Sequence, residues 1–163
     1  MRVMGIDPGL ANTGFGVIES TGSESRLLTA GTIETAAGEP LAQRLRAIHD
    51  GLAAVIREWA PEAVAVESLF FCTNVRTAIS VAQARGVALL ATSTGDVPLF
   101  EYTPLQIKQG LVGYGRAEKK QIQAMVKTIL NLKEVPKPDD TADALAAAIC
   151  HGHCAGHQEK LDK

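Results

Sequence analysis

Four carboxylates border the apolar segments of this 163-residue chain: Asp7, Glu67, Asp140 and Asp143. Asp7 and Glu67 each follow a short apolar run, whereas Asp140 and Asp143 precede one. An ionised carboxylate beside a hydrophobic core needs a compensating charge, and no Lys or Arg adjoins any of these acids in the sequence. The pattern therefore predicts a bound divalent cation, and a ligand set of carboxylate oxygens favours Mg²⁺ or Mn²⁺.

The length of the chain favours one domain, and we expect residues 1–154 to form it, followed by a polar tail at 155–163. Hydrophobic residues make up 46% of the chain but aromatic residues only 4%, so aliphatic side chains have to fill the core. No apolar stretch reaches membrane-spanning length, and no signal-peptide pattern opens the chain. We therefore expect a cytoplasmic protein without a membrane partner, whose three cysteines are reduced.

Hydrophobic periodicity divides the chain into strands and helices. Strands are predicted at 2–7, 13–19 and 26–35, and the short links between them indicate an antiparallel meander. Apolar residues spaced mostly three and four apart from Leu41 to Trp59 predict a helix, and the apolar run at 63–67 predicts a fourth strand. The remaining elements are a helix capped by Asn74, a strand at 97–103, and helices at 104–112, 117–130 and 141–154.

This order of elements predicts an α/β fold with a five-stranded mixed sheet, in which the meander is continued by parallel strands and helices cover both faces. A right-handed crossover places the fourth strand beside the first, so Asp7 and Glu67 are expected on adjacent central strands. Residues three apart share a face of a helix. Asp140 and Asp143 can therefore point toward the same place.

Basic residues gather in one part of the chain although the net charge is −2. The segment 108–137 contains seven Lys or Arg residues and only two acidic ones. A solvated helix face and a surface that contacts phosphates explain this run equally well.

Four segments carry a resemblance to a known family. They are 5–16 (GIDPGLANTGFG), 65–71 (AVESLFF), 113–119 (GYGRAEK) and 139–146 (DDTADALA). In this order and at this spacing they resemble the RuvC-type Holliday junction resolvases of the ribonuclease-H-like nuclease superfamily. The resemblance spans nearly the whole chain.

The resemblance implies a ribonuclease-H-like fold and a structure-selective DNA endonuclease. Such an enzyme resolves four-way (Holliday) junctions by paired, symmetrical, metal-dependent nicks during homologous recombination and DNA repair. Position by position, the residues that match the catalytic and metal-binding acids of the family are Asp7, Glu67, Asp140 and Asp143. Some members have His at the position of Asp140. Four carboxylates can hold two Mg²⁺ ions, for which Mn²⁺ is expected to substitute.

The resemblance also implies contacts with DNA and with other proteins. Phe70 matches an aromatic residue that wedges into the junction, although an ordinary core position is the alternative. Lys108 and Lys119 match basic residues beside the cleaved strand, and we add Arg116 and Lys120 from the same basic segment. The helix at 74–94 matches a dimer interface, and its small residues every four positions permit close packing of a homodimer: Ala78, Ala82 and Gly86. A RuvA–RuvB branch-migration complex is an implied partner.

Three other interpretations stay open at the level of sequence. A junction-binding module that has lost catalysis is disfavoured because all four acids are present. One lobe of an actin-like or sugar-kinase ATPase is disfavoured because that fold needs two lobes. A zinc site formed by Cys150, His151, His153, Cys154 and His157 is disfavoured because the spacing matches no common zinc motif. A helix end with buried thiols and solvated imidazoles explains those residues better.

Overall fold

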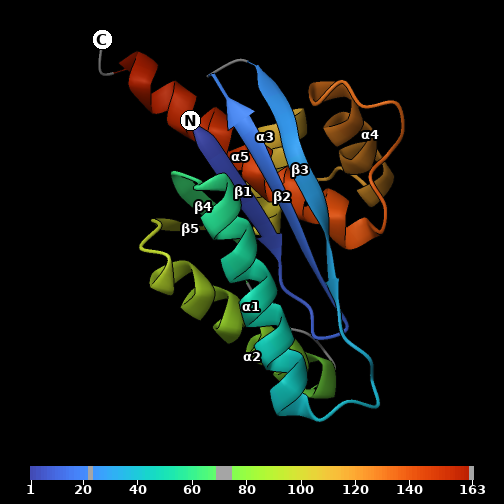
Figure 1. Cartoon of the computed structure of the whole chain (residues 1–163). Helices are drawn as coiled ribbons and strands as arrows, with labels where there is room; N and C mark the ends of the chain where they lie inside the picture. Colours follow the sequence, from blue (N-terminus) through green and yellow to red (C-terminus); the bar gives the residue numbers. More distant parts are fainter. Residues whose placement is uncertain (22–23, 69–74, 162–163) are drawn as a thin grey trace.

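The computed structural model describes residues 1–21, 24–68 and 75–161 (Figure 1). The strands are β1 (Arg2–Asp7), β2 (Asn12–Ser20), β3 (Ser25–Glu34), β4 (Ala63–Glu67) and β5 (Leu99–Tyr102). The helices are α1 (Leu41–Trp59), α2 (Val75–Thr94), α3 (Pro104–Val112), α4 (Lys119–Ile129) and α5 (Asp139–Leu161).

The five strands form one mixed sheet in the order β3-β2-β1-β4-β5. Strands β1, β2 and β3 pair antiparallel, whereas β4 runs parallel to β1, and β5 runs parallel to β4. The predicted fold class and the position of the fourth strand beside the first are therefore confirmed. Ile6 pairs with Val66, so Asp7 and Glu67 lie at the same end of neighbouring strands.

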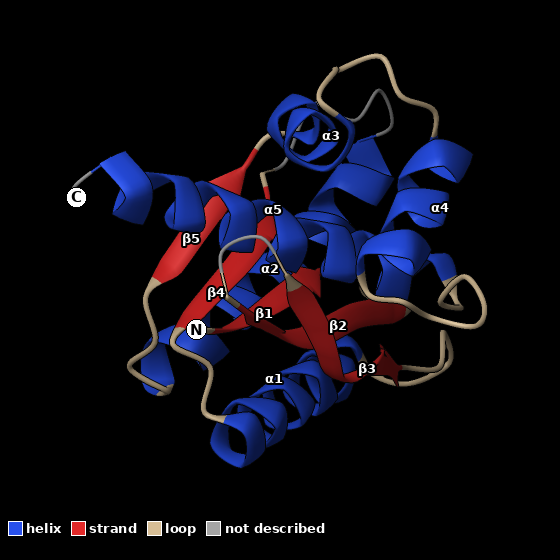
Figure 2. Ribbon diagram, turned by 90° about the horizontal axis from the view of Figure 1, so that it is seen from above, coloured by secondary structure: helices blue, strands red, loops and turns tan. Residues whose placement is uncertain are grey.

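Helices cover both faces of the sheet (Figure 2). On one face, Met4 and Val64 pack with buried residues of α1 and α2, including Leu52 and Ala88. On the other face, Val3 and its neighbours pack against α3, α4 and α5. Each central strand contributes to both cores, because successive side chains of a strand point to opposite faces. None of the described helices combines the length and apolar character that crossing a bilayer requires.

Helix α5 lies against β1 and β2 because three glycines leave room for it. A Cβ atom on Gly5 would collide with the carbonyl oxygen of Ala144, and one on Gly14 would collide with that of Asp140. A Cβ atom on Gly16, which pairs with Gly5 across the two strands, would strike the side chain of Leu145. The glycines thus form a flat surface on which the alanine-rich face of α5 rests. This contact determines how near the first turns of α5 come to the end of β1.

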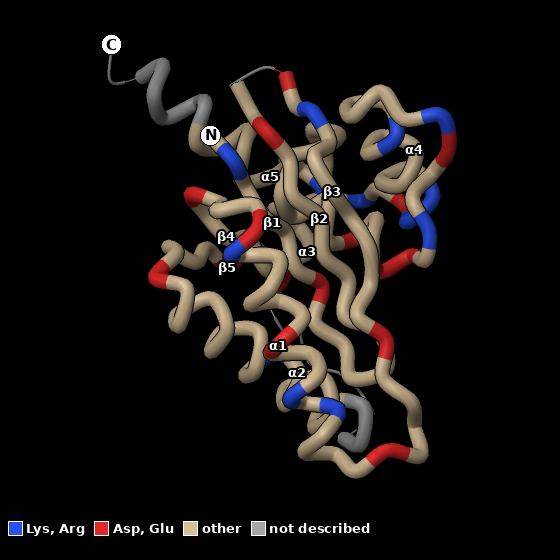
Figure 3. Tube along the Cα trace, in the orientation of Figure 1, with Lys and Arg blue, Asp and Glu red and all other residues tan. Residues whose placement is uncertain are grey.

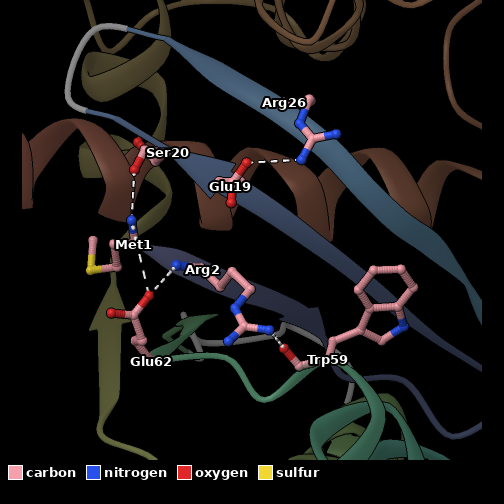
Figure 4. Close-up of polar contacts among 7 residues, drawn as sticks. All are labelled: Met1, Arg2, Glu19, Ser20, Arg26, Trp59 and Glu62. Atoms are coloured by element: carbon pink, nitrogen blue, oxygen red, sulfur yellow. Dashed lines mark hydrogen bonds and ion pairs between the residues drawn. The ribbon is translucent and has the colours of Figure 1, made fainter.

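The start of β1 is fixed by polar contacts (Figure 4). The terminal amine of Met1 donates to the carbonyl oxygen of Ser20 at 2.9 Å, which ties it to the end of β2. The Arg2 guanidinium donates to the carbonyl of Trp59 at 2.7 Å, and the Arg2 amide donates to the Glu62 carboxylate at 2.6 Å. These bonds hold β1 between β2 and the link from α1 to β4.

Three elements have bounds that differ by two residues or more from the sequence prediction. Strand β5 is shorter than 97–103, because Pro98 has no N–H to donate and Thr103 instead caps α3, accepting a hydrogen bond from the Gln106 amide. Helix α4 begins at Lys119 rather than at 117. Helix α5 begins at Asp139 and continues to Leu161, through most of the expected tail, which contains the good helix formers Gln, Glu and Lys. The domain boundary at 154 stays a prediction.

We predict that Gly5→Ala destabilises the protein by at least about 1–3 kcal/mol, because the new methyl group forces α5 away from the sheet. Thermal unfolding of the purified variant measures this. Gly38→Ala is the matched control, since no atom of the described part of the chain lies within 4 Å of a Cβ atom there. Equal melting temperatures for the two variants would contradict the proposed close contact.

Candidate active site

Three elements bring the four carboxylates together at one end of the sheet. Asp7 ends β1 and Glu67 ends β4, next to each other in the sheet. Asp140 and Asp143 occupy the first turns of α5, and the backbone of Asp140 lies against Gly14, the partner of Asp7 on β2. All three other acids are close enough to act on the charge of Asp7.

A cleft of about 200 Å³ opens beside these acids. Glu67 and Asp143 line it together with two lysines, Lys108 of α3 and Lys119 of α4. Apolar side chains complete the lining: Pro104, Ile107, Ile122 and Ala146. The cleft therefore places carboxylates and ammonium groups against a wall that excludes water from one side.

Asp7 has the strongest electrostatic perturbation of the four acids. Burial, followed by the charges of Asp143, Asp140 and Glu67, raises its pKa from 3.8 to about 7, and Lys119 opposes this only in part. Burial disfavours the charged form of a carboxyl group, and nearby like charges add to that effect. The site therefore carries negative charge that the protein itself does not fully compensate.

The other carboxylates of the cleft are perturbed in the same direction. Burial and the charge of Asp143 raise the pKa of Glu67, although Lys108 and Lys119 work against the rise. Burial also raises the pKa of Asp143, and a hydrogen bond from Lys119 offsets that rise only partly. Desolvation outweighs the ion pair at Asp143, so this carboxylate also attracts a further positive charge.

Lys119 corrects the expectation that only a metal compensates these acids. Its Nζ atom donates to Oδ2 of Asp143 at 2.9 Å and lies 3.2 Å from Oδ2 of Asp139. Partial burial acts to lower the pKa of Lys119, but the bonds to Asp143 and Asp139 outweigh burial and raise it. Lys119 and Asp143 are 24 positions apart in the sequence, so the sequence alone gives no sign of this contact.

The donor set suits a hard divalent cation, since it consists of carboxylate oxygens with unmet negative charge. Among the described residues, however, no three acidic, His or Cys side chains already stand at metal-ligand spacing. The bond from Lys119 occupies Oδ2 of Asp143, one of the oxygens that could bind a metal. The chemistry of the donor set fits a metal, for which Lys119 competes at Asp143.

Several Lys and Arg positions, drawn in blue in Figure 3, gather around α4. Lys108 and Lys119 line the cleft itself. Arg116 lies in the link before α4 and Lys120 in its first turn, and both are exposed. Phe70, the predicted wedge, lies outside the described residues. Asp139 contacts Lys119, and Gln123 donates to Asp139. Neither residue was singled out from the sequence, because neither a second Asp beside Asp140 nor a Gln on a polar helix has a distinctive pattern.

The predicted interface helix exposes an apolar stripe that is wider than expected. Ala82 and Gly86 are exposed, whereas Ala78 is only half-exposed. Ile79 and Leu90 extend the stripe, with exposed fractions of 54% and 57%. Large apolar side chains so exposed on one helix face are typical of a surface that another protein covers.

Three of the cysteine and histidine side chains near the end of α5 contact other groups of the protein. His151 is 5% exposed, and its Nδ1 lies 2.7 Å from the Tyr102 hydroxyl. His153 Nδ1 lies 3.0 Å from the carbonyl oxygen of Gly110, and Cys150 is buried beside Gln106. The expectation of solvated imidazoles and buried thiols is therefore wrong for His151, which packs under β5, and for Cys154, which is exposed.

Comparison with known proteins identifies the family. The model of the RuvC family, described as crossover junction endodeoxyribonuclease RuvC, matches residues 3–151. The chain belongs to the RuvC family. Its enzymatic function, endonucleolytic resolution of Holliday junctions, follows from that membership, and the family is one of metal-dependent nucleases.

Individual relatives agree with this assignment over the full length. RuvC of Pelotomaculum thermopropionicum is 53% identical over 161 residues, which are 99% of this chain and 98% of that protein. The Thermus thermophilus RuvC structure superposes with a TM-score of 0.90 at 40% identity, covering 97% of both chains. The T. thermophilus RuvC complex with a Holliday junction substrate gives a TM-score of 0.88 at 39% identity, covering 95% of both chains.

We predict that Asp7→Asn stabilises the metal-free resolvase at pH 8. The Asp7 carboxyl has a pKa of about 7 in the folded protein against 3.8 ordinarily, so ionising it disfavours folding. This penalty begins as the pH rises above 3.8 and is complete above about 7. One pKa unit corresponds to about 1.4 kcal/mol, so we expect a gain of at least about 1 kcal/mol in the free energy of unfolding.

Thermal unfolding in EDTA from pH 4 to pH 8 measures this effect. The difference between Asp7→Asn and wild type should grow with pH and nearly vanish at pH 4. Asp50→Asn is the control: Asp50 is exposed, and the hydrogen bond with His49 lowers its pKa, so its replacement should give no gain at pH 8. Equal stability of wild type and Asp7→Asn at pH 8 would refute the electrostatic description of the site.

Proposed function

We propose that Asp7, Glu67, Asp140 and Asp143 hold two Mg²⁺ ions, and that this site cuts one strand of a four-way DNA junction. The observation that supports this most directly is the convergence of acids from β1, β4 and α5 beside a cleft that contains two lysines, with the pKa values of Asp7, Glu67 and Asp143 raised. When bound, such ions activate water and stabilise the leaving 3′-oxygen of a phosphodiester. Mn²⁺ is proposed to substitute for Mg²⁺.

The protein's own groups have distinct roles in this proposal. Asp7 and Glu67 project from adjacent strand ends, so the rigid central sheet fixes their separation. Lys108 and Lys119 lie across the cleft, where their ammonium groups can neutralise a phosphate of the bound strand. The apolar wall that includes Ile107 and Ile122 limits water on that side and thereby strengthens the electrostatic contacts.

Contacts outside the cleft direct the DNA to it. We propose that exposed Arg116 and Lys120 bind phosphates, which give affinity without reading sequence. Phe70 is proposed to insert between bases near the cut, since apolar wedges distort duplexes in this way. A RuvA–RuvB complex is a proposed partner in the cell.

We also propose that the enzyme acts as a homodimer through α2. Symmetrical cutting of two strands needs two active sites related by a twofold axis. The exposed stripe of Ile79, Ala82, Gly86 and Leu90 offers a self-complementary apolar surface with a small residue at its centre. None of the described residues lies within 4 Å of a Cβ atom placed on Gly86, so a partner helix has room to approach closely there.

Incubation with an end-labelled four-way junction and Mg²⁺ tests the proposed function. Paired nicks at symmetrical positions in opposite strands support it. Binding without cleavage would favour a module that has lost catalysis, and hydrolysis of added ATP without nicking would favour the ATPase-lobe alternative.

We predict that Asp7→Asn binds the junction at least as tightly as wild type but does not cut it. A neutral amide is a poor ligand for Mg²⁺, whereas removal of one negative charge weakens repulsion of the phosphate by about 1 kcal/mol at 4 Å in water. Glu67→Gln and Asp143→Asn should behave alike. Gel-shift titration in Ca²⁺ measures binding, and the nicking assay in Mg²⁺ measures cleavage. Near-normal nicking by Asp7→Asn and Asp143→Asn would overturn the assignment of the metal site.

We predict that Gly86→Glu dissociates the dimer, because it places two like charges near the twofold axis. Sedimentation velocity at micromolar concentration should show the variant as a monomer. Its thermal unfolding curve, measured at low protein concentration, should match that of wild type. Gly38→Glu is the control, because it adds the same charge at an exposed position outside α2. A monomeric wild type would contradict the proposed interface.

A further inference from the structure

We propose that Lys119 is an internal counter-ion, which compensates part of the negative charge of the carboxylate cluster when no metal is bound. We further propose that Asp139 is a positioning residue that receives the Lys119 ammonium when a metal displaces it from Asp143. The inference rests on the proposed metal site. It adds to that site Asp139 and Gln123, two residues that do not belong to the set of four acids.

One ammonium group bridges two carboxylates in different surroundings. Lys119 Nζ lies 2.9 Å from Asp143 Oδ2 and 3.2 Å from Asp139 Oδ2. The Asp143 side chain is 29% exposed and lines the cleft, whereas the Asp139 side chain is 64% exposed and does not line it. Lys119 therefore has one partner inside the site and one at its rim.

Gln123 holds Asp139 in the orientation that this role requires. Its Nε2 atom donates to Oδ1 of Asp139 at 2.9 Å, which leaves Oδ2 directed to Lys119. Lys119 and Gln123 are four residues apart on α4, so both side chains lie on the same helix face. The start of α4 thus contacts Asp139, the first residue of α5, through two side chains.

A divalent cation bound to Asp143 repels the nearby ammonium group of Lys119 and competes with it for the same carboxylate. In the proposed site, a metal held by Asp143 therefore weakens the bond from Lys119 and favours its release from that carboxylate. The existing contact with Asp139 lets the ammonium swing outward without becoming unpaired. It then stands at the rim of the cleft, where it can meet the phosphate of an arriving strand.

Titration with Mn²⁺ in the absence of DNA, with free Mn²⁺ followed by electron paramagnetic resonance, tests the displacement. Lys119→Met should bind Mn²⁺ about fivefold more tightly than wild type, the effect of about one screened unit-charge contact. Lys120→Met removes the same charge from an exposed neighbour and should change the affinity less than twofold. Equal effects of the two replacements would overturn the proposal, because general charge alone would explain them.

A double-mutant cycle tests whether Asp139 acts through Lys119. Asp139→Asn should weaken Mn²⁺ binding about two- to fivefold, because the displaced ammonium has no receiving partner. The same replacement should have little effect in the Lys119→Met background, and Asp139→Glu should restore wild-type affinity. If Asp139→Asn weakens Mn²⁺ binding by the same factor in the Lys119→Met background, the loss of one negative charge explains its effect. That result would refute the positioning role.

Asp7→Asn separates this inference from the proposed function on which it rests. If wild type binds Mn²⁺ and Asp7→Asn does not weaken binding, the metal site itself is wrong and the inference falls with it. If Asp7→Asn abolishes binding while Lys119→Met leaves the affinity unchanged, the metal site stands and only the inference is refuted.

Discussion

The active site depends on the contact between α5 and the glycine surface of β1 and β2. Gly5 and Gly14 let the backbone of α5 rest directly on the strands, and Gly16 leaves room for the side chain of Leu145. The helix begins at the end of the sheet where Asp7 and Glu67 project. Asp140 and Asp143 therefore reach those acids, and a side chain on any of the glycines would move one half of the site away from the other.

The clustering of these four carboxylates lowers the stability of the folded protein but prepares the site to bind a metal. Four carboxylates near one another and partly buried repel, and the pKa of about 7 at Asp7 is the clearest sign of the resulting cost. Lys119 relieves some of this repulsion, but Asp143 still has a raised pKa despite its bond to that lysine. Functional sites commonly hold charge in this unrelieved state. A divalent cation removes the repulsion among these carboxylates. The relief of that repulsion favours metal binding.

Much of this arrangement could be predicted from the sequence, because its signals are local. The apolar run before Glu67 and the apolar repeat from Leu41 to Trp59 defined a buried strand and an amphipathic helix, and parallel crossover rules placed β4 beside β1. The four acids were found from their position beside apolar runs and by resemblance to the family, and the two cleft lysines by resemblance alone. The structure places all six at one end of the sheet.

The remainder depends on contacts between distant residues, for which no local pattern exists. Nothing in the sequence indicates that Lys119 bridges Asp139 and Asp143, because the pairing arises only when α4 packs beside α5. The burial of His151 likewise requires Tyr102 of the edge strand β5 to cover it. The role of Gly14 and Gly16 was hidden because glycines in a strand also mark bulges and turns.

The central claim is that these carboxylates form a metal site for phosphodiester hydrolysis. Anomalous diffraction from crystals soaked in Mn²⁺ tests it most directly, since it locates the ion without relying on activity. We expect anomalous density among the carboxylates of Asp7, Glu67 and Asp143, with the Lys119 side chain withdrawn from Asp143. The claim would be contradicted if the anomalous density lay elsewhere and these carboxylates bound no ion, although the same protein nicked junctions in Mn²⁺.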